Sequence, residues 1–62
     1  MNYKEDVKKY NLAIEVIDEL LHRLEDRIKN EPNEEIWKTE QFHLNSAKEL
    51  IEMDIPYLDN NY

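Results

Sequence analysis

The chain has 62 residues, no cysteine and no glycine, and 15 acidic against 8 basic residues give it a net charge of −7 at pH 7. A chain of this length forms one domain at most, and burying only about 60% of its unfolded surface leaves its stability marginal without a disulfide, a metal or a partner. The missing cysteines exclude disulfides. The negative charge repels phosphate backbones and anionic membranes, so we expect neither direct nucleic-acid binding nor membrane binding.

The first ten residues, MNYKEDVKKY, are polar and mixed in charge, which is unlike the apolar core of a signal peptide. No apolar run approaches the roughly 20 residues that cross a bilayer. We therefore expect a cytoplasmic protein. Frequent Asn, Ile, Lys and Tyr without Gly are typical of an AT-rich coding sequence, which points to a bacterium or to a phage whose protein acts in its host.

Apolar side chains at alternating spacings of four and three predict one long helix over residues 3–30. This heptad stripe consists of Tyr3, Val7, Tyr10, Ile14, Ile17, Leu21, Leu24 and Ile28. Basic residues near position 28 favour the negative pole of the helix and indicate its end. Asn30 tolerates the left-handed conformation that ends many helices, and Pro32 disfavours helix at the residue before it.

A second helix is predicted over residues 33–54, with Glu34 and Glu35 in its first turn, where carboxylates favour the positive pole of the helix. Its apolar positions are Ile36, Trp37, Leu44, Ala47, Leu50, Ile51 and Ile55. Pro56 is expected to stop the helix. Residues 56–62 would then form a short tail after a helical domain of residues 1–55.

The connection NEPN is short, so the two helices must be antiparallel neighbours in an all-α hairpin. No strand is predicted, because apolar and polar residues nowhere alternate for long. The predicted hairpin core consists of Val7, Tyr10, Ile14, Ile17, Leu21, Leu24, Ile28, Ile36, Trp37, Leu44, Ala47, Ile51 and Ile55.

The apolar residues of the first helix span an arc of roughly 180°, wider than one neighbouring helix covers. The excess forms an outer line with basic ends, made of Lys9, Leu12, Val16, Leu20, Arg23 and Arg27. The second helix carries an apolar and acidic outer line made of Glu35, Phe42, Glu49 and Met53. Complementary charge predicts that the first helix of one hairpin packs on the second helix of another, giving a coiled-coil-like homodimeric four-helix bundle. The alternative is that these lines bind a different protein.

One pattern resembles a metal-binding motif, because Glu-x-x-His occurs once on each helix, as ELLH and as EQFH. Glu40 and His43 fall on the predicted apolar face with Glu25 at a similar height, so these three are the weak metal candidates. The simpler interpretation is that Glu40 and His43 are partly buried and bond each other or a tyrosine. We favour it and expect neither metal nor cofactor.

No arrangement of residues predicts an enzyme. Ser46 and Thr39 have no neighbouring base with a third group to orient it, and two helices offer no concave substrate pocket. We expect a protein-binding regulator or inhibitor. The runner-up is a phage-encoded mimic of nucleic acid, in which carboxylates imitate a phosphate backbone and block a host enzyme. These carboxylates belong to Glu31, Glu34, Glu35, Glu49, Glu52, Asp54 and Asp59. The third hypothesis is a structural assembly subunit.

Overall fold

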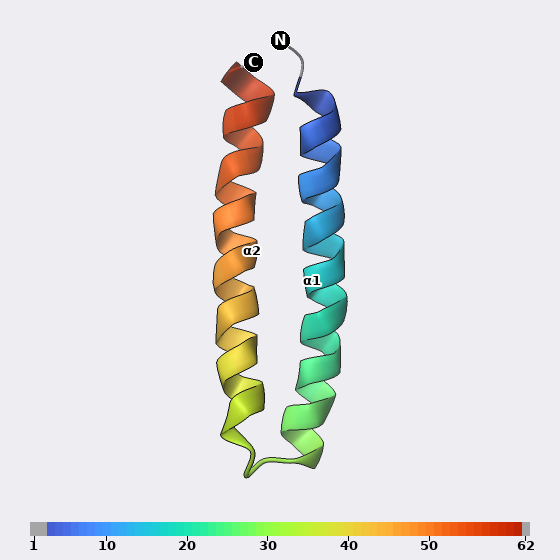
Figure 1. Ribbon diagram of the computed structural model, residues 1–62, viewed down its shortest axis with the longest axis vertical. Coiled ribbons are helices and arrows are strands. Elements are labelled where there is room, and N and C mark those ends of the chain that lie inside the picture. Colours follow the sequence, from blue (N-terminus) through green and yellow to red (C-terminus); the bar gives the residue numbers. More distant parts are fainter. Residues whose placement is uncertain (1–2, 62) are drawn as a thin grey trace.

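The chain folds into two antiparallel helices of equal length, α1 over Lys4–Asn30 and α2 over Glu35–Asn61. In the computed structural model the two helices lie side by side, with both termini at one end and the connection at the other (Figure 1). The structure describes residues 3–61 and the side chains up to residue 59. The predicted all-helical hairpin is confirmed. Residues 1, 2 and 62, at the ends of the predicted domain and tail, lie outside the described residues.

Backbone hydrogen bonds hold both ends of helix α1. Val7 N–H donates to the carbonyl oxygen of Tyr3 at 2.9 Å, and Glu31 N–H donates to that of Arg27 at 2.7 Å. Glu31 follows the helix with φ −131°, and no described residue has a positive φ. The left-handed end at Asn30 that the sequence suggested is therefore wrong, because Asn30 stays helical and Glu31 turns the chain instead.

A tight turn joins the helices. Glu34 N–H donates to the carbonyl oxygen of Glu31 at 3.1 Å. This bond spans the three-residue step of a β-turn and places Pro32 at the second position, where its fixed φ is favourable. Because the turn uses Pro32 and Asn33, α2 begins at Glu35, two residues later than predicted.

The predicted end of α2 at residue 54 and the tail of residues 56–62 are wrong. The helix runs through Pro56 to Asn61. A proline removes one backbone N–H inside a helix, which leaves the carbonyl of Glu52 without its helical donor. Glu52 and Pro56 lie at the exposed surface, and Ile55 and Leu58 stay half-buried because α1 runs alongside to Lys4. Packing against α1 thus outweighs the local effect of the proline.

The core is a thin line between the two helices. Leu24, 8% exposed, is the one buried side chain among the described residues. All but one of the other predicted core residues are half-buried. The half-buried ones are Val7, Tyr10, Ile14, Ile17, Leu21, Ile28, Trp37, Leu44, Ala47, Ile51 and Ile55. The exception is Ile36, which is 55% exposed. Its assignment to the core is wrong, because Trp37 faces α1 at this height and its neighbour in sequence points about 100° away around the helix.

The molecule is a flat rod measuring 49 by 15 by 11 Å. It exposes 5191 Å² of surface, whereas a compact monomer of 7.6 kDa is expected to expose about 4,300 Å². Within the described residues, neither helix has an apolar stretch of the length that spanning a membrane requires. Two helices alone therefore leave much of this chain uncovered.

Candidate interaction surface

The two broad sides of the hairpin differ in chemistry, and one of them is polar. On this side Lys48 of α2 reaches Asp18 of α1, with Nζ 2.7 Å from Oδ1. The hydrogen bond with Asp18 raises the pKa of Lys48, which stabilises its charged form. The groove beside this ion pair is lined mostly by charged side chains: Asp18, Glu19, Leu21, His22, Glu25 and Lys48.

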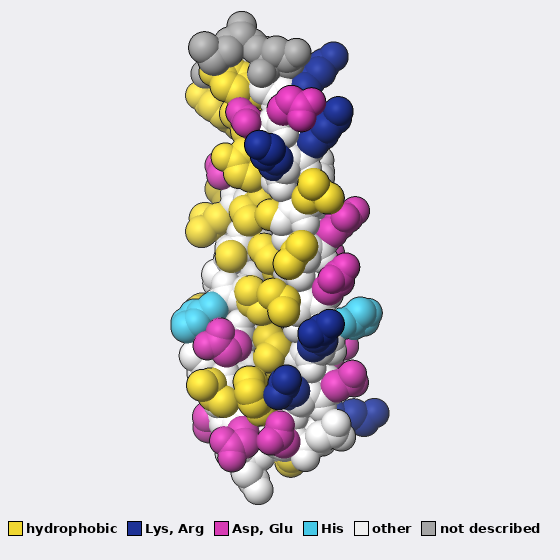
Figure 2. Space-filling view, turned by 45° about the vertical axis from the view of Figure 1, so that its right-hand side comes forward, with side chains coloured by type: hydrophobic (Ala, Val, Ile, Leu, Met, Phe, Trp, Pro, Cys, Tyr) yellow, Lys and Arg dark blue, Asp and Glu magenta, His cyan; other side chains and the backbone are white. Residues whose placement is uncertain are grey.

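The opposite side is apolar. Figure 2 shows hydrophobic side chains in a band that runs along the molecule, with charged side chains at its margins. A groove on this side joins both helices and is lined by Leu20, Arg23, Leu24, Arg27, Glu40 and Leu44. Leu24 and Leu44 belong to the interhelical core, so the core opens directly onto this surface. The hairpin therefore presents one side that a second apolar surface can cover.

The predicted outer line of α1 is exposed along its whole length. The exposed fractions are 59% for Leu12, 54% for Val16 and 41% for Leu20. Arg23 and Arg27 are exposed too. Leu20 and both arginines line the groove on the apolar side, so these three residues of the line border the core on that side.

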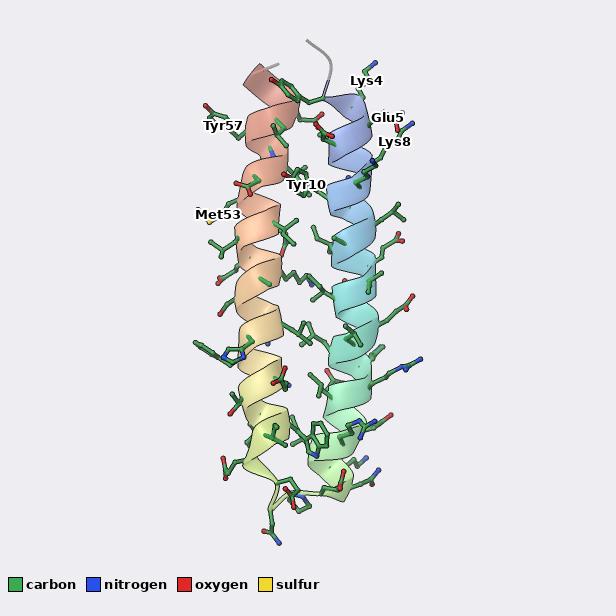
Figure 3. The ribbon with its side chains drawn as sticks, viewed as in Figure 1. Lys4, Glu5, Lys8, Tyr10, Met53 and Tyr57 are labelled. Atoms are coloured by element: carbon green, nitrogen blue, oxygen red, sulfur yellow. The ribbon has the colours of Figure 1, made fainter. Side chains whose placement is uncertain are left out.

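The predicted outer line of α2 is equally exposed but lies elsewhere. Phe42 is 69% and Met53 70% exposed, and in Figure 3 Met53 projects from α2 away from α1, whereas Tyr10 lies between the helices. Phe42 and Glu49 line a shallow groove of α2 alone, together with Asn45, Ser46, Lys48 and Glu52. The residues predicted to form one interface thus lie on two surfaces. Leu20, Arg23 and Arg27 of α1 lie on the broad apolar side, and Phe42, Glu49 and Met53 lie on the outer edge of α2.

Three further large apolar side chains of α2 are exposed, and none of them belongs to the outer line predicted for this helix. Ile36, Leu50 and Tyr57 are 55%, 63% and 60% exposed. They recur on α2 at intervals of seven and fourteen residues, which places them along one line of the helix. That spacing was present in the sequence, but the apolar core positions beside these residues obscured it.

The structure separates the three metal candidates. Glu25 lies beside His22, with Oε2 3.6 Å from Nδ1. Glu40 and His43 are both exposed, so the expectation that they are partly buried is wrong. The reason is that α2 directs Leu44 and Trp37 toward α1 and leaves these polar residues beside the core. Within the described part of the chain, no three His, Cys, Asp or Glu side chains lie close enough to hold a metal ion.

Trp37 closes the core near the turn. The Cζ atom of Arg27 lies 4.7 Å from the centroid of the Trp37 ring, in the geometry of a cation–π contact. The Trp37 Nε1–H group is buried and has no hydrogen-bond partner among the described residues. The guanidinium group of Arg27 thus covers the Trp37 ring on the apolar side and stays exposed to solvent on its other side.

No protein-family model, curated protein or solved structure matches this chain. The chemistry of the surface is therefore the guide to function. An exposed apolar band with charged margins suits the binding of another protein surface.

Proposed function

We propose that this chain forms a homodimeric four-helix bundle and that the dimer acts by binding another protein, as a regulator or inhibitor. The observation that supports this proposal is that far more large apolar side chains are exposed than buried. One side chain, Leu24, is buried among the described residues, while eight large apolar side chains are between 41% and 70% exposed. Monomeric soluble proteins rarely expose apolar surface in contiguous patches larger than a few hundred Å².

The broad apolar side is large enough for a dimer. A side of 49 by 15 Å amounts to about 700 Å² per copy and about 1,500 Å² per pair, within the usual 1,200–2,000 Å² of stable interfaces. Covering Val16, Leu20 and Leu50 contributes on the order of 1.5–3 kcal/mol for each side chain that becomes fully buried. A second copy therefore supplies the core that one hairpin lacks.

The outer edge of α2 is the proposed surface for the other protein. Phe42, Glu49 and Met53 lie on it, with Glu52 beside Glu49 in the same groove. Exposed phenylalanine and methionine surrounded by carboxylates fit a partner with an apolar pocket and a basic rim. These side chains point away from α1, so dimerisation through the broad apolar side leaves them accessible.

Two measurements test this function. Sedimentation equilibrium at micromolar concentration is expected to give twice the 7.6 kDa mass of the chain, and a monomer would contradict the dimer. Binding of a defined partner is expected to weaken when Phe42 becomes alanine. A partner must first be identified, by affinity capture from the native cell extract and confirmation with purified proteins.

The nucleic-acid mimic remains the second candidate because of one observation. Glu49 and Glu52 line the same groove of α2 within a chain of net charge −7. A mimic binds mainly through charge, so its binding falls steeply with salt and competes with DNA. A structural assembly subunit, the third candidate, would form oligomers larger than a dimer and bind no other protein.

A further inference from the structure

We infer that the two copies of the proposed dimer point in the same direction, with both turns at one end and α1 of each copy packed on α2 of the other. This inference rests on the proposed homodimer and specifies the geometry of its interface. Two side-by-side hairpins related by a two-fold axis can bury the apolar side in two ways. Either the axis runs along the helices and α1 faces the partner's α2, or it runs across them and each helix faces its own copy.

Each helix carries a second line of side chains at heptad spacing on the apolar side. The α1 line is Lys9, Ala13, Val16, Leu20, Arg23 and Arg27, and the α2 line is Glu40, His43, Ala47, Leu50 and Asp54. We call these two lines the dimer seams. Leu20, Arg23, Arg27 and Glu40 share one groove, which shows that both seams border the same side of the hairpin. Spacings of three and four keep the remaining members in line.

The seams differ in charge. The α1 seam holds three cations and no carboxylate, whereas the α2 seam holds two carboxylates and no Lys or Arg. If each helix faced its own copy, the cations of α1 would meet cations and the carboxylates of α2 would meet carboxylates. If α1 faces the partner's α2, each seam meets the opposite charge. Juxtaposed like charges are costly and select against wrong pairings.

Heights along the rod support the same choice. Two contacts define which residues of α1 and α2 lie at equal height: Asp18 with Lys48, whose numbers add to 66, and Arg27 with Trp37, whose numbers add to 64. A two-fold axis parallel to the helices involves no shift along them, so residues at equal height within one hairpin also meet across the interface. Pairs whose numbers add to about 65 therefore face each other.

This rule brings matching side chains together. Val16 meets the partner's Leu50, and Leu20 lies within two residues, or about 3 Å along the axis, of the partner's Ala47. At the ends of the seams, Lys9 lies within the same two residues of the height of the partner's Asp54. Arg23 likewise lies within two residues of the height of the partner's Glu40. None of these four charged residues has an ion-pair partner among the described residues of its own hairpin.

Cysteine cross-linking tests the orientation, because the natural chain has no cysteine. Val16→Cys and Leu50→Cys variants are purified separately, checked for helicity by circular dichroism, and then mixed and treated with a short bis-maleimide. The inference predicts a covalent dimer containing one of each variant in the mixture, and little cross-linking of Val16→Cys alone. Each chain in the mixture carries only one of the two cysteines, so no cross-link can form within a single hairpin.

The other outcomes separate this inference from the proposed function. Efficient cross-linking of Val16→Cys alone would show that α1 faces its own copy, which overturns the orientation but keeps the homodimer. A dimer in sedimentation equilibrium with no cross-link in any mixture would place the interface on another surface and overturn the inference. A monomer in sedimentation equilibrium would overturn the inference and the proposed homodimer together.

A matched pair of substitutions supplies a control. Leu50→Glu places a carboxylate in the α2 seam, and Phe42→Glu places one on the outer edge of the same helix, from a side chain of similar exposure. The inference predicts that Leu50→Glu weakens dimerisation at least tenfold, while Phe42→Glu leaves it nearly unchanged. The reverse order would contradict the assignment of the seam.

Discussion

Lys48 Nζ lies 2.7 Å from Asp18 Oδ1 and ties the middle of α2 to the middle of α1 on the polar side of the hairpin. The lysine is half-buried and the aspartate exposed. This ion pair shows which residues of the two helices lie at the same height along the rod. The pairing of residues in the proposed interface is read from this register.

The first prediction concerns this pair and pH. The hydrogen bond with Asp18 raises the pKa of Lys48 above its ordinary value of 10.5, so the stabilisation by the pair is present at neutral pH and is lost as pH rises above 10.5 through the raised pKa. Lys48→Gln should lower the melting temperature at pH 7 more than Lys38→Gln, a matched charge change on the same helix. The difference should vanish at strongly alkaline pH, and equal melting temperatures at pH 7 would contradict this role.

The second prediction concerns the buried residue of the core. Leu24→Ala should destabilise the protein by about 2–5 kcal/mol, because it removes a buried side chain and leaves a cavity. Urea unfolding followed by circular dichroism measures the effect. Phe42→Ala serves as the control, since its side chain is exposed and surface changes usually stay within about 0.5 kcal/mol. Comparable losses in the two variants would show that the core lies elsewhere.

The third prediction concerns the proline inside α2. Pro56→Ala should raise the melting temperature, because alanine restores the N–H donor to the carbonyl of Glu52 and is favoured over proline by up to about 3 kcal/mol in a helix interior. Pro32→Ala should act in the opposite direction, since Pro32 occupies a favourable turn position. If the helix ended before residue 56, Pro56→Ala would leave the thermal unfolding curve unchanged.

The fourth prediction distinguishes the two binding hypotheses once a partner is in hand. If the outer edge of α2 binds through apolar contacts, Phe42→Ala should weaken the complex tenfold or more. If the protein imitates nucleic acid, reversing Glu49 and Glu52 to lysine should matter more, and affinity should fall steeply between low and high salt. Thr39→Ala is the control, because the Thr39 hydroxyl bonds only the carbonyl of Glu35 in its own helix at 3.3 Å. Calorimetry or surface binding at several salt concentrations measures all variants.

Much of the fold follows from the sequence. The four-and-three spacing from Val7 to Ile28 and the short connection at Pro32 are sufficient to predict two long antiparallel helices, because helical periodicity and turn chemistry are local properties. The sequence also predicts that the outer line of α1, which includes Val16 and Leu20, is exposed, because a single neighbouring helix is too narrow to cover it. The sequence alone also determined the excess of negative charge and the absence of cysteine.

The tertiary structure decided the points that depend on which side chains meet. The packing of Ile55 and Leu58 beside α1 carries the helix through Pro56, against its local preference. The rotation of α2 about its axis directs Trp37 inward, where it is half-buried, and Ile36 outward, where it is 55% exposed. A helix has one periodicity but any rotation about its axis, and contacts with a second helix are what select that rotation.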